Sequence, residues 1–281
     1  MTEPVLGARH REVDRLRRLT RRATERSAAG LFVVEGPTLV AAALAAAAPL
    51  EAVYVAAPNG RKFEDLLARA TAAGVPVREL APGVLERVAD TATPQGVVAL
   101  CRSVTVGLDA IATGGFVLVG VDVADPGNAG TMIRAADATG ARAVVFTGTS
   151  VDVTNPKVVR AAAGSLFHLP VVAARRPDPP IPEVDEGESA GAAAVLRALA
   201  ASGRRLVGAA AHAGEASDVA DLTGDLAIVV GNEAHGLPPS LALDGFVHVP
   251  MEGRAESLNV AVAAAILCYE SARQRRGARR D

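Results

Sequence analysis

Apolar residues recur at helical spacing near the start of the chain. Between residues 10 and 27 the apolar positions are Val13, Leu16, Leu19 and Ala23. Their spacing of three or four residues predicts one amphipathic helix. A second stripe at the same spacing is basic and consists of Arg11, Arg15, Arg18, Arg22 and Arg26. This stripe is compatible with a solvated helix face and with a surface that follows nucleic-acid phosphates, and the pattern alone leaves both interpretations open.

Short apolar runs then alternate with segments of helical pattern as far as Arg102. The predicted strands cover residues 31–34, 52–56, 75–77 and 96–101, and the predicted helices cover residues 38–48, 62–73 and 85–89. This alternation predicts a small three-layer α/β domain over residues 1–105. Residues 106–115 end in Thr-Gly-Gly, which is typical of a linker.

A second α/β pattern begins at Phe116. The run Phe-Val-Leu-Val-Gly-Val is typical of a buried parallel strand. Further strands are predicted at residues 143–147, 167–172, 205–210, 226–230 and 246–249, and helices at residues 129–139, 156–163, 192–202 and 258–275. Residues 177–191 hold four prolines and five acidic residues, which predicts a flexible insertion. The pattern therefore predicts a second domain, with a parallel sheet, over residues 116–281.

Composition narrows the function classes. The chain of 281 residues is 50% hydrophobic and 21% charged, which excludes a disordered, collagen-like or coiled-coil protein. The formal net charge of −2 provides no overall basic field, so any nucleic-acid binding would depend on local patches. The two cysteines, Cys101 and Cys268, exclude a disulfide scaffold and a clustered-cysteine zinc site, and we expect no metal.

Membrane association is also not expected. The longest apolar stretch, around residues 39–50, is too short to span a bilayer. The first residues, which include Thr2, Glu3 and Pro4, lack the apolar region of a secretion signal. We therefore expect a cytoplasmic protein.

Three polar segments follow predicted strands and are candidates for site chemistry. Residues 125–134 (DPGNAGTMIR) permit a tight strand-to-helix turn whose backbone N–H groups suit an anion, although a simple capped turn has the same composition. Residues 231–237 (GNEAHGL) place a carboxylate and an imidazole where open α/β sheets build their sites. In residues 249–260 (VPMEGRAESLNV), Ser257 is the predicted N-cap of the last helix. Asn259 is a mediocre helix former just inside that helix, which suggests a hydrogen-bonding role.

Taken in this order, the segments resemble the three motifs of the SpoU (TrmH) family of the SPOUT methyltransferases. The first motif is matched by Asn128, Gly130 and Arg134, the second by Gly231, Asn232, Glu233, Gly236 and Leu237, and the third by Val249, Pro250, Met251, Ser257, Leu258, Asn259 and Val260. Residues 155–165 look like the family's linking helix and Gly-Ser turn. The arginine-rich helix followed by Phe-Val-Val-Glu-Gly (32–36) is similar to the ribosomal-protein-like substrate-binding module that precedes many members.

The resemblance implies a fold and a cofactor. The C-terminal domain would contain a deep trefoil knot, an exception to the rule that chains are unknotted, and would pair with a second copy in a homodimer. S-adenosylmethionine would bind bent in the knot, largely through backbone groups. By position, the implied cofactor-binding residues are Thr147, Gly148, Ala210, Gly231, Val249, Met251 and Leu258.

The resemblance also implies methyl transfer to a ribose 2′-hydroxyl of RNA, without a metal. The implied catalytic residues are Arg134, Asn128, Glu233, Ser257 and Asn259. Because a guanidinium stays protonated, we expect Arg134 to orient and polarise the hydroxyl together with a substrate phosphate. The expected RNA contacts are Arg11, Arg15, Arg18, Arg22, Arg26 and Arg160.

The substrate is expected to be ribosomal RNA, specifically 23S ribosomal RNA, because the N-terminal module is commoner in family members that modify ribosomal RNA. Two alternatives stay open at this point. One is a transfer-RNA 2′-O-methyltransferase, and the other is a catalytically silent RNA- or ribosome-binding protein that has kept the fold.

Overall fold

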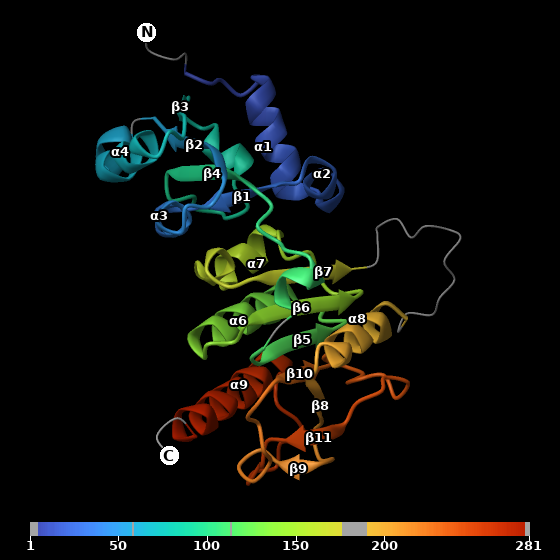
Figure 1. The fold of residues 1–281 in the computed structure, drawn as a ribbon. Helices are drawn as coiled ribbons and strands as arrows, with labels where there is room; N and C mark the ends of the chain where they lie inside the picture. The colour runs from blue at the N-terminus through green and yellow to red at the C-terminus, as the bar shows by residue number, and fades with distance from the viewer. Residues whose placement is uncertain (1–4, 58, 113, 176–189, 279–281) are drawn as a thin grey trace. The chain divides into compact units, whose positions relative to one another are not determined.

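The computed structural model describes residues 5–57, 59–112, 114–175 and 190–278, which form two compact units (Figure 1). Unit 1 contains residues 1–104 and 154–168, and unit 2 contains residues 105–153 and 169–281. Residues 154–168 group with unit 1 because α7 (Pro156–Ala161) packs on β1 (Leu31–Glu35) and Phe167 stacks on Phe32 at 6.4 Å between ring centroids. The domain boundaries proposed from the sequence remain a prediction.

Unit 1 contains a four-stranded mixed sheet in the order β1-β4-β2-β3. The strands β2 (Leu50–Ala56) and β3 (Val77–Leu80) are parallel, whereas β4 (Val97–Arg102) is antiparallel to both β1 and β2. The helices of the unit, besides α7, are α1 (Arg11–Arg21), α2 (Ala23–Ala29), α3 (Pro37–Ala45), α4 (Glu64–Ala72) and α5 (Leu85–Val88).

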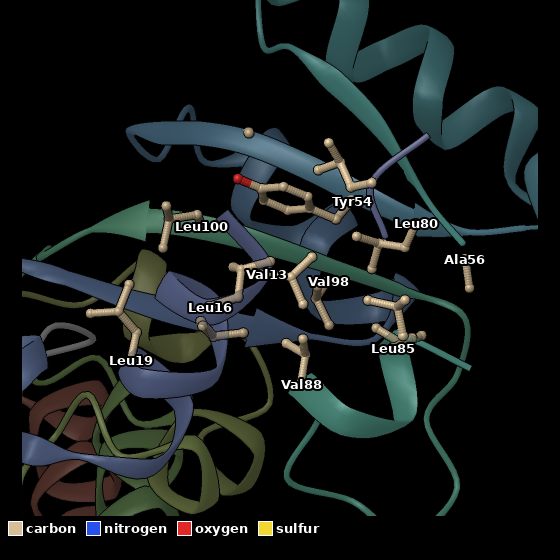
Figure 2. Close-up of a cluster of buried hydrophobic side chains, with 14 of the residues drawn as sticks. Val13, Leu16, Leu19, Tyr54, Ala56, Leu80, Leu85, Val88, Val98 and Leu100 are labelled. Carbon is tan, nitrogen blue, oxygen red and sulfur yellow. The ribbon is translucent and has the colours of Figure 1, made fainter. Parts of the chain in front are cut away.

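The core of unit 1 lies between α1, α5 and one face of this sheet (Figure 2). The apolar stripe of α1 supplies Val13, Leu16 and Leu19 to it. Alternate residues of β1 contribute to this core, while Phe32 and Val34 are buried on the opposite face of the strand. A strand that is buried on both faces requires layers on both sides of the sheet, as the sequence pattern predicted.

The prediction of one continuous helix over residues 10–27 is wrong at Arg22. The backbone of Arg22 is extended, with φ −123° and ψ 118°, and separates α1 from α2. Arg26 explains the break, because its buried guanidinium donates to the carbonyls of Leu19 at 3.0 Å and Thr20 at 3.3 Å. These are carbonyls that the end of a helix leaves without an intrahelical partner.

Unit 2 contains a seven-stranded sheet in the order β7-β6-β5-β10-β8-β11-β9. Every pairing in it is parallel, which confirms the predicted parallel sheet. The strands are β5 (Val117–Val121), β6 (Ala143–Gly148), β7 (Val171–Arg175), β8 (Arg205–Ala209), β9 (Glu215–Ala216), β10 (Leu226–Val230) and β11 (Gly245–His248). The strand expected over residues 167–172 begins only at Val171, because residues 165–167 form a 3₁₀ turn.

Helices cover both faces of this sheet (Figure 1). The helices α6 (Pro126–Ala138) and α9 (Val260–Gly277) pack against each other on one side, and α8 (Ala190–Ala201) covers the other. The insertion predicted at residues 177–191 lies outside the described residues except for its last two positions, which belong to α8. Among the described residues, no helix has the length and apolar content needed to cross a membrane. The trefoil knot stays a prediction.

The segment predicted as a linker is fixed to unit 2 by a buried arginine. Arg204 is 2% exposed, and its guanidinium donates to the carbonyls of Ile111 at 2.7 Å and Gly114 at 2.9 Å. A third bond reaches the carbonyl of Gly115 at 3.3 Å. Ile111 itself is fully buried, so this part of the chain is packed against the unit.

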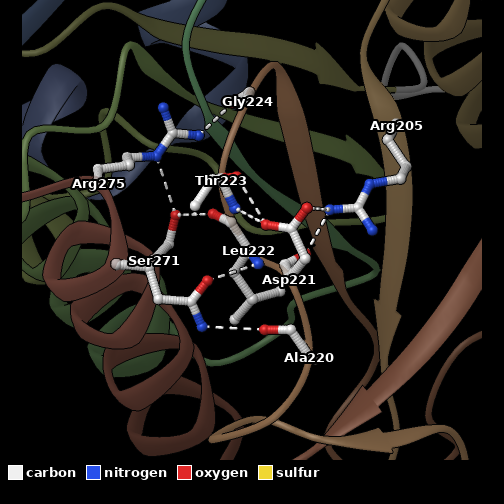
Figure 3. A network of polar contacts seen from close by, with 9 residues as sticks. Arg205, Ala220, Asp221, Leu222, Thr223, Gly224, Ser271 and Arg275 are labelled. Carbon is white, nitrogen blue, oxygen red and sulfur yellow. Dashed lines mark hydrogen bonds and ion pairs between the residues drawn. The ribbon is translucent and has the colours of Figure 1, made fainter. Parts of the chain in front are cut away.

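A polar network ties α9 to the segment that precedes β10 (Figure 3). Gln274 accepts from the N–H of Leu222 at 2.8 Å and donates to the carbonyl of Ala220 at 2.9 Å, while Ser271 donates to the carbonyl of Leu222 at 2.7 Å. Hydrogen bonds from Thr223 lower the pKa of Asp221. The network fixes the C-terminal half of α9, whose other end reaches the candidate site.

Replacing Arg204 with leucine should destabilise the protein by about 3 kcal/mol, since buried carbonyls would lose charged donors. The matched control is Arg197→Leu, because Arg197 is exposed on α8 and its replacement should change the free energy of unfolding by about 0.5 kcal/mol or less. Chemical denaturation measures both. Equal unfolding midpoints for the two variants would show that Arg204 does not stabilise the fold.

Candidate active site

A cavity of about 300 Å³ opens at the C-terminal ends of β8, β10 and β11 in unit 2. Its lining is dominated by small and apolar residues: Ala209, Ala210, Ala211, Val230, Gly231, Val247, Val249, Met251, Leu258, Val260, Ala263 and Leu267. The polar residues at its border include Asn232, Glu233 and Ser257. A cavity with an apolar lining and few polar groups suits a small organic ligand.

The loop after β10 is a tight turn that only glycine permits at its first position. A Cβ on Gly231 would lie 2.2 Å from the carbonyl carbon of Gly236. Asn232 and Gly236 exchange backbone hydrogen bonds of 3.0 and 2.9 Å. The side chain of Asn232 accepts from the N–H groups of Ala234 at 2.9 Å and His235 at 3.2 Å. Hydrogen bonds between residues 232–236 therefore stabilise the turn, which carries Glu233.

A chain of side-chain hydrogen bonds joins the three sequence motifs. Asn128 Nδ2 donates to Glu233 Oε1 at 2.9 Å, and Asn259 Nδ2 donates to Asn128 Oδ1 at 3.0 Å. Glu233 also accepts from the N–H groups of Ala124 at 3.4 Å and Asp125 at 3.3 Å. One carboxylate therefore holds both the β5–α6 turn and Asn128.

Asn259, and not Ser257, is the N-cap of the last helix, so that sequence prediction is wrong. Asn259 has φ −53° and ψ 138°, and its Oδ1 accepts from the N–H groups of Ala261 at 2.9 Å and Val262 at 3.3 Å. Asparagine is among the preferred N-caps, which explains a residue type that seemed out of place in a helix. Its amide performs two tasks, because the oxygen caps α9 and the nitrogen reaches Asn128.

The charge of Glu233 determines which atoms donate and which accept in these side-chain hydrogen bonds. Burial raises the pKa of Glu233, but the hydrogen bonds from Asn128 and from backbone N–H groups, including those of Asp125 and Ala124, outweigh it, so the pKa lies below its usual value. An ionised carboxylate only accepts hydrogen bonds. Asn128 must therefore present its NH₂ group to Glu233 and its oxygen to Asn259.

Arg134 lies on α6, six residues after Asn128, and its side chain is exposed. No carboxylate within the described ranges forms an ion pair with it. Glu233 binds Asn128 and the neighbouring backbone, so its contacts are not with Arg134. The exposed guanidinium of Arg134 is therefore available to a ligand.

The structure brings together most, but not all, of the residues expected to bind a cofactor. Ala210, Gly231, Val249, Met251 and Leu258 line the cavity. Thr147 and Gly148 do not line it; Thr147 is fully buried at the end of β6. Sequence reasoning missed the α9 residues Val260, Ala263 and Leu267, although their helical spacing placed them on one face.

The arginines expected to contact RNA differ in their surroundings in unit 1. Arg15 pairs with Glu51 at 3.4 Å, and Arg18 pairs with Asp14 at 3.5 Å. Arg11 and Arg22 are exposed. Their contacts with RNA stay a prediction.

One of the expected RNA contacts needs correction, and a second has carboxylate partners in unit 1. Arg26 is only 5% exposed and binds the carbonyls at the end of α1, so it is not available to RNA. Arg160 donates to Asp90 at 2.7 Å and lies 3.7 Å from Glu35, and its contact with RNA stays a prediction. In the described part of the chain, no three His, Cys, Asp or Glu side chains are grouped closely enough to hold a metal ion.

A parallel α/β sheet with a cavity at the C-terminal ends of its strands is typical of proteins that bind a small cofactor. Residues 115–269 match the model of the SpoU rRNA Methylase family, and residues 10–99 match that of the MRM3-like substrate binding domain. The chain belongs to the SpoU rRNA methylase family.

Two curated relatives span most of the chain. It is 36% identical over 247 residues to the 23S rRNA (guanosine(2553)-2'-O)-methyltransferase RlmP of Bacillus subtilis, which covers 87% of this chain and 90% of that protein. It is 32% identical to the 23S rRNA (guanosine-2'-O-)-methyltransferase RlmB of Bordetella pertussis, over 81% of this chain and 91% of that protein.

Solved structures give the same result for the fold. The AdoMet-bound rRNA methyltransferase from Sinorhizobium meliloti superimposes with a TM-score of 0.79 at 27% identity, over 96% of this chain and 98% of that one. The SpoU methyltransferase AviRb from Streptomyces viridochromogenes, in complex with AdoMet, gives a TM-score of 0.78 at 30% identity, over 95% of this chain and 100% of that one.

Replacing Asn128 with alanine should raise the pKa of Glu233, because burial would then be opposed by fewer hydrogen bonds. In the native protein the lowered pKa keeps the hydrogen-bonded carboxylate at neutral pH, and this stabilisation is lost as the pH falls through that pKa. An NMR titration of the Glu233 carboxyl carbon measures the shift. Asn155→Ala is the control, since Asn155 caps α7 in unit 1; a Glu233 pKa that is the same in all three proteins would refute the assigned contacts.

Proposed function

We propose that this chain transfers a methyl group from S-adenosylmethionine to a ribose 2′-hydroxyl of 23S ribosomal RNA, in the cytoplasm. The observation that carries this proposal is the pair of hydrogen bonds from Asn259 to Asn128 and from Asn128 to Glu233. These bonds join all three family motifs beside the cavity, which Glu233 lines. The names of RlmP and RlmB, both 23S rRNA 2'-O-methyltransferases, support the choice of substrate.

The cavity fits S-adenosylmethionine. Alanine, valine and leucine side chains line the cavity and would form an apolar slot for an adenine ring, whose polar edge would face the backbone at Gly231 and Ala210. Ala210, Gly231, Val249, Met251 and Leu258 would hold the cofactor. When bound, the cofactor supplies an electrophilic methyl group on a positively charged sulfur.

The remaining chemistry belongs to side chains of this protein. Because a guanidinium stays protonated, Arg134 would bind a phosphate beside the target ribose and stabilise the negative charge that develops on the 2′-oxygen, while the hydroxyl proton leaves to water. Asn128 holds the ribose in position, and its own orientation is set by Glu233 and Asn259. Ser257, at the border of the cavity, shapes the site where cofactor and ribose meet.

Unit 1 would hold the RNA. Its match to the MRM3-like substrate binding domain supports this role. The exposed arginines of α1 and the α1–α2 junction, Arg11, Arg15, Arg18 and Arg22, would contact the phosphate backbone. Their partners Glu51 and Asp14 are exposed enough for these ion pairs to exchange with RNA phosphates at little cost.

A second copy of the chain would cover α9. Val262, Ile266 and Tyr269 are 46%, 37% and 58% exposed, and their spacing places them on one face of the helix. Apolar residues gathered on one exposed face indicate an interaction surface. Because the N-cap of α9 is Asn259, a partner on this face would lie beside the active site, which supports a homodimer formed through unit 2.

Replacing Arg134 with alanine should reduce methyl transfer by about 100-fold or more, since it removes the only charge assigned to the hydroxyl. Affinity for S-adenosylmethionine should change by less than about twofold, because Arg134 does not line the cavity. Transfer of labelled methyl groups and calorimetry measure these two quantities. Arg142→Ala, at an exposed arginine, is the control; native turnover in the Arg134 variant would exclude the assigned role.

Replacing Ile266 with glutamate should convert a dimer into a monomer, since it would bury a charge in an apolar contact. Light scattering at micromolar concentration should give the mass of two chains for the native protein and of one chain for the variant. Val219→Glu is the matched control, because Val219 is an apolar residue of unit 2 that is 77% exposed and belongs to the segment before β10, not to α9. A monomeric native protein would contradict the shared interface.

A further inference from the structure

Asp122, directly after β5, has a backbone conformation that side chains rarely adopt. Its φ is +55°, in the left-handed region that favours glycine. Ala47 and Ala163 are the other non-glycine residues with positive φ in the described chain, and both lie in unit 1. Strain of this kind persists where surrounding contacts impose it, and it is commonest at functional sites.

The backbone of Asp122 connects two loops of the site. Its N–H donates to the carbonyl of Thr147 at 3.2 Å, and its carbonyl accepts from Asn232 Nδ2 at 2.8 Å. The oxygen of the Asn232 amide is already used by Ala234 and His235, so the orientation of this amide is fixed. The carbonyl of Asp122 is therefore the anchor for the turn that carries Glu233.

The carboxylate of Asp122 holds the loop after β6. Its Oδ1 accepts from the backbone N–H of Thr149 at 2.6 Å and from the Thr149 hydroxyl at 2.9 Å. Gly148, between the two strand ends, has φ +69°, and a Cβ there would lie 2.1 Å from the same oxygen. Glycine at 148 thus makes room for the carboxylate, which gives this position a role outside the cavity.

Ser150 also links the ends of β5 and β6. Ser150 Oγ donates to the carbonyl of Thr147 at 2.7 Å and accepts from the N–H of Val123 at 3.1 Å. The ends of β5 and β6 are therefore joined by bonds from both Asp122 and Ser150, and the Asp122 carbonyl extends the connection to the turn after β10.

We propose that Asp122 is a positioning residue for the cofactor: by holding Thr149 with its carboxylate and Asn232 with its carbonyl, it fixes the 231–236 turn against the cavity. This proposal rests on the proposed function, because it takes S-adenosylmethionine as the ligand of that cavity. The side chain of Asp122 keeps the backbone in the conformation in which its carbonyl meets Asn232. It acts through Asn232 and does not line the cavity.

Two substitutions separate the side chain from the backbone conformation. Asp122→Gly allows positive φ without strain but removes the acceptor for Thr149. Asp122→Asn retains an oxygen acceptor and also tolerates positive φ. If only the backbone conformation mattered, glycine would serve as well as aspartate.

The test measures binding of S-adenosylmethionine and of its demethylated product S-adenosylhomocysteine by calorimetry, without RNA. We expect Asp122→Gly to weaken binding of both by about tenfold, as for the loss of hydrogen bonds to a charged group, and Asp122→Asn to restore affinity to within about threefold of native. In turnover, the KM for S-adenosylmethionine should rise in Asp122→Gly while the KM for RNA stays the same. Native affinity in Asp122→Gly would overturn the proposal.

Hydrogen exchange of the free protein keeps the test independent of the proposed function. Asp122→Gly should speed exchange of amides in residues 147–150 and 231–236, and Thr149→Val, which removes only the hydroxyl bond, should do so to a smaller extent. Ala163→Gly is the matched control, since it also places glycine at a positive φ and should leave both segments unchanged. If native protein bound neither ligand, the proposed function would fail, whereas unchanged exchange in Asp122→Gly would refute the link through Asp122 itself.

Discussion

The amide of Asn128 is the constraint on which the active site depends. It is held between an ionised carboxylate, Glu233, and the amide of Asn259. These residues come from the first turn of α6, the turn after β10 and the start of α9, so the Asn128 side chain contacts segments more than 100 residues away in the sequence. An ionised carboxylate only accepts hydrogen bonds. The charge of Glu233 therefore determines how the amides of Asn128 and Asn259 are oriented.

Arginines in this protein serve two distinct purposes. Arg26 and Arg204 are buried and satisfy backbone carbonyls where a helix ends and where a loop crosses the surface of unit 2. Arg134 is exposed on α6, without an ion pair among the described residues. Arg26 and Arg204 use their donors on the protein, whereas we propose that Arg134 uses its donors on a ligand, and residue type alone does not separate the two groups.

Hydrophobic periodicity was sufficient to predict the parallel sheet of unit 2 and most helices, because each element is decided by neighbours in sequence. The break at Arg22 could not be predicted in this way, since it depends on Arg26 bonding to carbonyls that lie seven and six residues earlier in the chain. Only part of the role of Asn259 could be predicted from the sequence. Its polarity in a helical segment was clear, but its use as an N-cap depends on where the backbone leaves the extended conformation. Likewise, Gly148 supports Asp122 from outside the cavity, a contact between strand ends that no local pattern encodes.

The measurement that tests the account most directly is the identity of the methylated product. Purified protein would be incubated with 23S ribosomal RNA and S-adenosylmethionine labelled in its methyl group, and the RNA would be digested to nucleosides for mass spectrometry. The account predicts the label in a 2′-O-methylated nucleoside. Label on a base, or no label in RNA, would contradict it.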